Sequence, residues 1–146
     1  MSPESIGIII GILFVAPTIY LIKRTNSESW AWPVFLMTLP IYYMAFGLLV
    51  LDGSVILQEL LYGAPYLIIG LITWKARFSL AYPLLAVAWL SHGFYDYYHD
   101  LLFVNPGVFS WYPAFCALVD IAIGGYLLLN SWQSMRAFGN SSDTST

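Results

Sequence analysis

Charged side chains are scarce in this sequence. Asp, Glu, Lys and Arg make up 9% of its 146 residues and hydrophobic residues make up 60%, whereas a soluble domain has about 25% charged and about 45–50% apolar residues. The five basic residues form no run that would hold the phosphates of nucleic acid or of anionic lipids. The composition therefore excludes a soluble domain and a nucleic-acid partner, and it predicts the lipid bilayer as the environment.

Cysteine is also nearly absent. The sequence has a single cysteine, Cys116, whereas an internal disulfide requires two and the cysteine-based zinc sites of one chain require several. No basic residue lies near Cys116 in the sequence to activate its thiol. The sequence therefore excludes a disulfide and a cysteine-based metal site within one chain.

Long apolar runs fill the chain instead. A helix needs about 20 apolar residues to cross a bilayer, and polar or turn-forming residues separate five runs of this length. Trp30 and Trp32 are predicted to mark a membrane interface, and Pro33 is predicted to lie in the first turn of the second helix. We predict an all-α fold, an integral membrane bundle of five transmembrane helices that forms a single domain (1–138), followed by a disordered polar tail (139–146). The predicted spans are about 6–22, 30–51, 55–74, 80–102 and 111–132.

The basic residues predict how the bundle is inserted. They fall into three groups that five alternating spans place on one side of the membrane, and this side is cytoplasmic by the positive-inside rule. The N-terminus is therefore predicted to lie outside and the C-terminus in the cytoplasm. The groups are Lys23 with Arg24, Lys75 with Arg77, and Arg136.

The fourth predicted span carries an unusual group of ionisable residues. His92, Asp96 and His99 follow one another at intervals of four and three residues. At about 100° per residue, this spacing places all three within an arc of about 60° on one face of a helix. The three side chains therefore form a candidate site.

Two acidic residues from other spans are predicted to join this face. Asp120 and His92 are equally far along the chain from Pro106, so antiparallel fourth and fifth helices bring them to the same depth. Glu59 enters the same half of the bundle from the third span. A charged Asp at the centre of a membrane helix costs about 2.5–3.5 kcal/mol, so these acids are expected to face inward and to be paired.

The cluster is compatible with several functions, and the sequence does not decide whether the protein is an enzyme. As an acid–base site, the catalytic residues His92, Asp96, Asp120 and Glu59 would exchange protons with a small, lipid-soluble ligand. As a metal site, His92, Asp96 and His99 would bind a divalent transition metal such as zinc, iron or copper, with Glu59 or Asp120 completing the set of ligands. Alternatively, the buried polar groups only fix helix packing in a structural or partner-binding subunit, or they serve a proton or ion transporter. A homo-oligomer is compatible with the sequence but not indicated by it.

The last two spans resemble a known group of proteins. The shared residues begin with a helix of the form His-Gly-x-x-Asp-x-x-His and continue past the following turn into the fifth span. This pattern is similar to that of a family of small, uncharacterised bacterial multi-span membrane proteins. The resemblance implies a multi-helix membrane fold with a shared polar site, in the bacterial inner membrane, and it implies no particular substrate. It rests on Trp89, His92, Gly93, Asp96, His99, Pro106, Trp111, Tyr112, Pro113, Phe115, Cys116 and Asp120.

Overall fold

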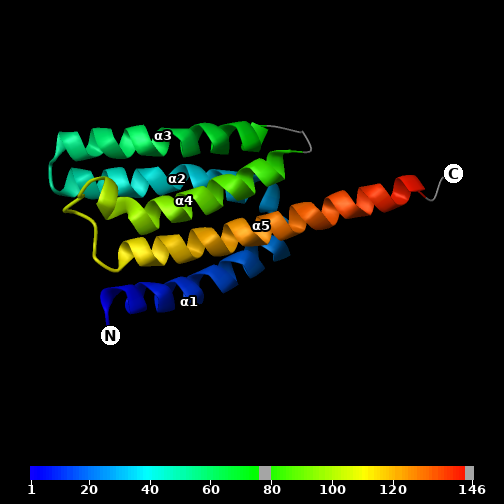
Figure 1. Ribbon diagram of the computed structural model, residues 1–146, viewed down its shortest axis with the longest axis horizontal. Coiled ribbons are helices and arrows are strands. Elements are labelled where there is room, and N and C mark those ends of the chain that lie inside the picture. The colour runs from blue at the N-terminus through cyan, green and yellow to red at the C-terminus, as the bar shows by residue number, and fades with distance from the viewer. Residues whose placement is uncertain (76–79, 144–146) are drawn as a thin grey trace.

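The computed structural model describes residues 1–75 and 80–143, with side chains described as far as Trp132. These residues form five helices joined by short connections (Figure 1). The all-α prediction is confirmed, and each helix coincides with one predicted span. The helices are α1 (Pro3–Arg24), α2 (Glu28–Leu49), α3 (Gly53–Lys75), α4 (Ala81–Leu102) and α5 (Tyr112–Asp143).

Local sequence signals explain where several helices begin and end. The Ser2 side chain accepts a hydrogen bond from the Ser5 backbone N–H, and Pro3 follows in the first turn of α1, an arrangement that suits a helix N-terminus. Asp52 caps α3 by accepting bonds from the backbone N–H groups of Ser54 and Val55 and from the Ser54 hydroxyl. These three donors hold the pKa of the exposed Asp52 carboxyl below its ordinary value.

Four of the helices are long and apolar enough to cross a membrane. They are α1, α2, α3 and the Tyr112–Trp132 part of α5, and they indicate an integral membrane protein. Large apolar side chains on their outer faces are exposed, including Leu13, Leu49 and Leu61. Lipid would cover these side chains.

Helix α4 is as long as α2 but does not belong to this group of four. The reason is that α4 carries the ionisable residues of the candidate site. Its polar side chains His92, Asp96 and His99 are buried, whereas Phe94, Tyr97 and Leu101 on its outer face are exposed. The ionisable residues of the candidate site therefore lie on the face that the other helices cover, whereas Asp100 lies on the exposed side.

The helices alternate in direction, and α4 is covered on several sides. It packs along α5 and α3 and touches α2, while α2 packs along α3. Helix α1 packs on α5 and hardly touches α2 (Figure 1). The ring centroids of Trp32 and Trp89 lie 6.3 Å apart within the apolar core.

The two ends of the bundle differ in charge. Helices α1 and α3 both end at the same side of the bundle (Figure 1), which therefore carries Lys23, Arg24 and Lys75; we call it the basic end. The opposite, acidic end carries Asp52 and Asp100. Arg77 and the Arg136 side chain lie outside the described residues, and the orientation across the membrane stays a prediction.

Three sequence expectations need comment. Trp32 was expected at an interface but is fully buried, with its ring against Trp89 and Tyr126. Pro33 lies inside α2 and not in its first turn, because the helix begins earlier, where Trp30 and Ala31 donate backbone hydrogen bonds to Ser27. Helix α5 continues through Asp143 and so overlaps the predicted tail 139–146, of which residues 144–146 lie outside the described part.

Close contact between α4 and α5 depends on small residues. A Cβ atom added at Gly124 would lie 2.7 Å from Leu90 Cγ and 2.9 Å from the Leu90 backbone nitrogen. A Cβ atom added at Gly93 would lie 2.9 Å from Ile121 Cγ1. Both glycines therefore allow the two backbones to approach each other, as small residues do in membrane bundles.

We expect Gly124→Ala to lower the free energy of unfolding by about 1–3 kcal/mol, because the added methyl group overpacks the α4–α5 contact. The matched control is Gly125→Ala, since a Cβ atom at Gly125 meets nothing within 4 Å. Denaturation by SDS of both variants in mixed micelles measures the difference. Equal stability of the two variants would contradict the assigned contact.

Candidate functional site

The polar face predicted for α4 exists, and all of it is buried. His92 is 1% exposed, and Asp96 and His99 are 0% exposed. The three side chains do not meet at one point, however. They divide between two clusters, one with Asp120 of α5 and one with Glu59 of α3.

The first cluster consists of His92, Asp96 and Asp120, which we call the His92 centre. The Nδ1 atom of His92 lies 2.7 Å from Asp120 Oδ2 and 3.2 Å from Asp96 Oδ2. The prediction that antiparallel fourth and fifth helices bring His92 and Asp120 to the same depth is thereby confirmed. One imidazole thus faces two carboxylates, and all three side chains are buried.

Hydrogen bonding in the His92 centre is incomplete. His92 donates its Nδ1 proton to Asp120, and one N–H cannot be aimed well at a second acceptor. Among the described residues, His92 Nε2, both oxygens of Asp96 and Asp120 Oδ1 have no hydrogen-bond partner. Unpaired buried polar atoms are costly, about 1–3 kcal/mol for each neutral group, and such atoms call for an explanation in a native site.

The second cluster, the Glu59 network, is satisfied instead. Glu59 Oε1 accepts bonds from Asn105 Nδ2 at 2.8 Å and from His99 Nε2 at 3.0 Å. Glu59 Oε2 accepts a bond from the Tyr95 hydroxyl at 3.0 Å. Asn105 also donates to the Tyr43 carbonyl, so the network links α2, α3 and α4 to the loop before α5.

The structure therefore regroups the predicted site residues. Among the described residues, the group whose ligand atoms lie within 4.8 Å of one another is His92, Asp96 and Asp120. His99, which the sequence places with His92 and Asp96 as a metal ligand, bonds to Glu59. Glu59, predicted as a catalytic residue beside His92, belongs to the Glu59 network and not to the His92 centre.

Sequence reasoning missed two members of the Glu59 network. The sequence predicts neither the bond from Tyr95 to Glu59 nor the burial of Asn105, which Pro106 and Gly107 mark as a turn residue. Asn105 is buried, and its side-chain oxygen accepts the Gly107 backbone N–H at 3.1 Å. The sequence offers only a polar residue that lies three positions after the end of α4, directly before Pro106 and Gly107. Turn chemistry alone explains such a residue equally well.

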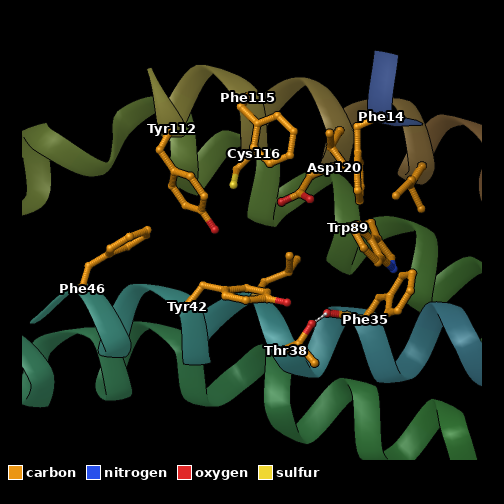
Figure 2. A pocket seen from close by; sticks show the side chains of 13 residues that line it. Phe14, Phe35, Thr38, Tyr42, Phe46, Trp89, Tyr112, Phe115, Cys116 and Asp120 are labelled. Atoms are coloured by element: carbon orange, nitrogen blue, oxygen red, sulfur yellow. Dashed lines mark hydrogen bonds between the residues drawn. The ribbon is translucent and has the colours of Figure 1, made fainter. Parts of the chain in front are cut away.

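An apolar cavity adjoins the His92 centre. It has a volume of ≈ 330 Å³ and lies between α1, α2, α4 and α5. Figure 2 shows the Asp120 carboxylate and the Tyr112 hydroxyl pointing into this cavity, with Tyr42 across from them. Asp120 therefore belongs both to the buried polar centre and to the wall of the cavity.

The outer wall of the cavity reaches the surface of the bundle. Phe14 of α1 is 48% exposed and Tyr42 of α2 is 52% exposed, although both also line the cavity. This wall lies where α1 and α2 pack poorly against each other. Both helices also carry exposed apolar side chains that lipid would cover, so this wall of the cavity borders a surface suited to lipid.

Comparison with known proteins adds nothing to this geometry. The chain matches no protein-family model, no curated protein and no solved structure. The resemblance of the last two spans to small bacterial membrane proteins stays a prediction, and the function is inferred from the residues alone.

We expect Asn105→Ala to lower the free energy of unfolding by about 1–3 kcal/mol, because it leaves Glu59 Oε1 and the Tyr43 carbonyl short of a buried hydrogen bond. Val104→Ala is the matched control, since Val104 is the adjacent loop residue and its side chain is exposed. Unfolding in detergent measures both. Stability equal to that of the control would show that Asn105 does not anchor this loop.

Proposed function

We propose that this protein is an integral membrane enzyme that acts on a small, lipid-soluble ligand. The proposal rests on one observation: Asp120 belongs both to the His92 centre and to the wall of the cavity. Its Oδ2 atom is bonded to His92, and its carboxylate points into the apolar cavity (Figure 2). A ligand in the cavity would meet one carboxylate, that of Asp120, and this carboxylate lies beside His92 and Asp96.

The cavity favours a ligand with a short apolar body and one polar end. At about 30 Å³ for each water-sized volume, a cavity of ≈ 330 Å³ has room for roughly ten carbon-sized groups. The aromatic and aliphatic walls would bind the apolar body. A hydroxyl or amino group at the other end would donate a hydrogen bond to Asp120 Oδ1, which has no partner among the described residues.

The chemistry proposed for the His92 centre is proton transfer. Asp120 faces the ligand and would accept or donate the proton at the reacting atom. His92 orients the Asp120 carboxylate through the Nδ1 bond, and Asp96 is close enough, at 3.2 Å from His92 Nδ1, to stabilise a protonated imidazole. Two carboxylates repel each other in a buried site, so the centre is most stable when protons are shared among its three groups.

We expect Asp120→Asn to reduce conversion of the ligand by a factor of about 10²–10⁴, the usual contribution of a general acid or base, while ligand binding persists. Untargeted lipid mass spectrometry of membranes that hold the wild type or the variant would detect the conversion. A ten-carbon alcohol that carries a photoreactive diazirine would report binding through cross-links to cavity residues.

Two variants of α2 serve as controls for the same experiment. Thr38→Trp fills the cavity and should abolish labelling, whereas Ile41→Trp changes a side chain that is 53% exposed and should leave labelling and conversion intact. Labelling spread over the lipid-facing surface and insensitive to Thr38→Trp would refute a ligand site in the cavity. Unchanged lipid products in Asp120→Asn membranes would refute the acid–base role.

A specific observation favours a second candidate function, metal binding. His92, Asp96 and Asp120 offer one nitrogen and two oxygens within 4.8 Å of one another, a donor set that suits zinc or iron. A divalent metal would also satisfy the unpaired atoms of the carboxylates and act as a Lewis acid toward a ligand at the cavity wall.

If the His92 centre binds a metal, the purified protein should retain about one zinc or iron ion per chain, and Asp96→Asn should lower the retained amount by at least about tenfold. Elemental analysis by inductively coupled plasma mass spectrometry measures this after dialysis against a weak chelator. Asp52→Asn is the control, since Asp52 is an exposed carboxylate far along the chain from the centre. Retention that is equal in both variants would rule out a metal at these residues.

We also propose that α4 crosses the membrane with the other four helices and that the N-terminus lies outside. Support comes from the apolar outer face of α4 and from the collection of Lys23, Arg24 and Lys75 at one end of the bundle. In that orientation the acidic end, with Asp52 and Asp100, faces the outer aqueous phase.

A further inference from the structure

We propose that Asp100, His99 and Glu59 form a proton relay between the water at the acidic end and the buried interior of the bundle. This inference rests on the proposed function, because the relay would supply protons for acid–base chemistry at the His92 centre. The contacts of His99 carry it.

His99 bridges a surface carboxylate and a buried one. Its Nδ1 atom lies 3.3 Å from Asp100 Oδ1, and its Nε2 atom lies 3.0 Å from Glu59 Oε1. The Asp100 side chain is 74% exposed, whereas those of His99 and Glu59 are 0% and 1% exposed. An imidazole with one nitrogen toward water and one toward the interior is the arrangement in which histidine passes protons.

The surroundings of His99 leave Asp100 as its polar contact with the outside. Three aromatic rings surround the imidazole, at distances measured between ring centroids. The Tyr43 ring of α2 stacks on it at 4.7 Å. The Tyr95 ring of α4 lies edge-on to it at 5.4 Å, and the Phe103 ring lies at 4.9 Å. Glu59 faces it from α3. The ionisable groups that face His99 from these elements are therefore Glu59, Asp100 and the two tyrosines.

The transfer step balances without any further reactant. A protonated Asp100 gives its proton to His99 Nδ1 while His99 Nε2 gives its own proton to ionised Glu59. The products are ionised Asp100, His99 with its proton on Nδ1, and neutral Glu59. Three events reset the relay for the next transfer: the His99 proton returns from Nδ1 to Nε2, Glu59 gives up its proton, and Asp100 takes a new proton from water.

The His92 centre needs such a route because no other path to water is evident among the described residues. Its three side chains are at most 1% exposed, and the cavity beside Asp120 is lined mostly by aromatic and aliphatic side chains. Tyr95 lies between the two clusters. Its hydroxyl bonds to Glu59, and its ring centroid lies 5.5 Å from the ring centroid of His92. The relay therefore ends one aromatic ring from the His92 centre.

The test is a pH jump followed by time-resolved infrared spectroscopy, with the full-length protein in lipid nanodiscs. The band of the protonated Glu59 carboxyl is assigned by its loss in Glu59→Gln. We expect Asp100→Asn and His99→Gln each to slow the appearance of this band by roughly tenfold or more. Formate in the buffer, a small weak acid, should restore the rate in Asp100→Asn.

The matched control is Asp52→Asn, which changes another exposed carboxylate of the acidic end while asparagine still caps α3. Its rate should equal that of the wild type. A rate in Asp100→Asn equal to that of the control, or a Glu59 carboxyl that takes up no proton in the pH jump, would overturn the relay. Because Asp100 is exposed, its substitution is not expected to unfold the protein.

The outcome is separable from that of the proposed function, because the infrared measurement needs no ligand. Asp120→Asn should leave the rate of Glu59 protonation unchanged. Normal lipid conversion in Asp120→Asn, together with a slow rate in Asp100→Asn, would refute the acid–base role of Asp120 and retain the relay. Loss of conversion in Asp120→Asn with an unchanged rate in Asp100→Asn would do the reverse.

Discussion

The contact between the backbones of α4 and α5 is the constraint on which the site depends. His92 and Asp120 have short side chains, so a distance of 2.7 Å between Nδ1 and Oδ2 requires helix axes that lie close together. Gly93 and Gly124 provide that approach, since a Cβ atom at either would meet the facing helix within 3 Å. Without it, an imidazole and two carboxylates would be buried in an apolar medium without partners, a state that costs several kcal/mol.

The two polar clusters differ in how completely they are bonded: the Glu59 network has a partner for each carboxylate oxygen, whereas the His92 centre has buried atoms without one. In the Glu59 network both carboxylate oxygens accept hydrogen bonds from side chains of α4 and of the following loop. Such saturation suits a group that fixes helix positions. In the His92 centre, four buried atoms have no partner among the described residues, although the same helix supplies both clusters. A purely structural reading of the His92 centre leaves that cost unexplained.

Much of this arrangement follows from the sequence. Apolar runs of fixed length place the five helices, the spacing of His92, Asp96 and His99 places one polar face on α4, and equal distances from Pro106 place His92 opposite Asp120. The division of that face into two clusters does not follow from it. His99 lies two turns from His92, and whether it turns toward His92 or toward Glu59 depends on the position of α3, which short turns do not fix. The burial of Trp32 depends in the same way on how α2 packs against α4 and α5.

The cavity follows from the peripheral place of α1. Helix α1 packs on α5 and α2 packs on α3, so the aromatic side chains of α1 and α2 meet across a space that neither backbone fills. The same two helices carry exposed apolar surfaces, so this space is continuous with the lipid-facing side of the bundle. The proposed reaction and the proposed relay assign one approach to each cluster: an apolar one between α1 and α2 that ends at Asp120, and a polar one at the acidic end that ends at Glu59. An enzyme that took its ligand from lipid and its protons from water would use both, and α4 carries residues of each cluster.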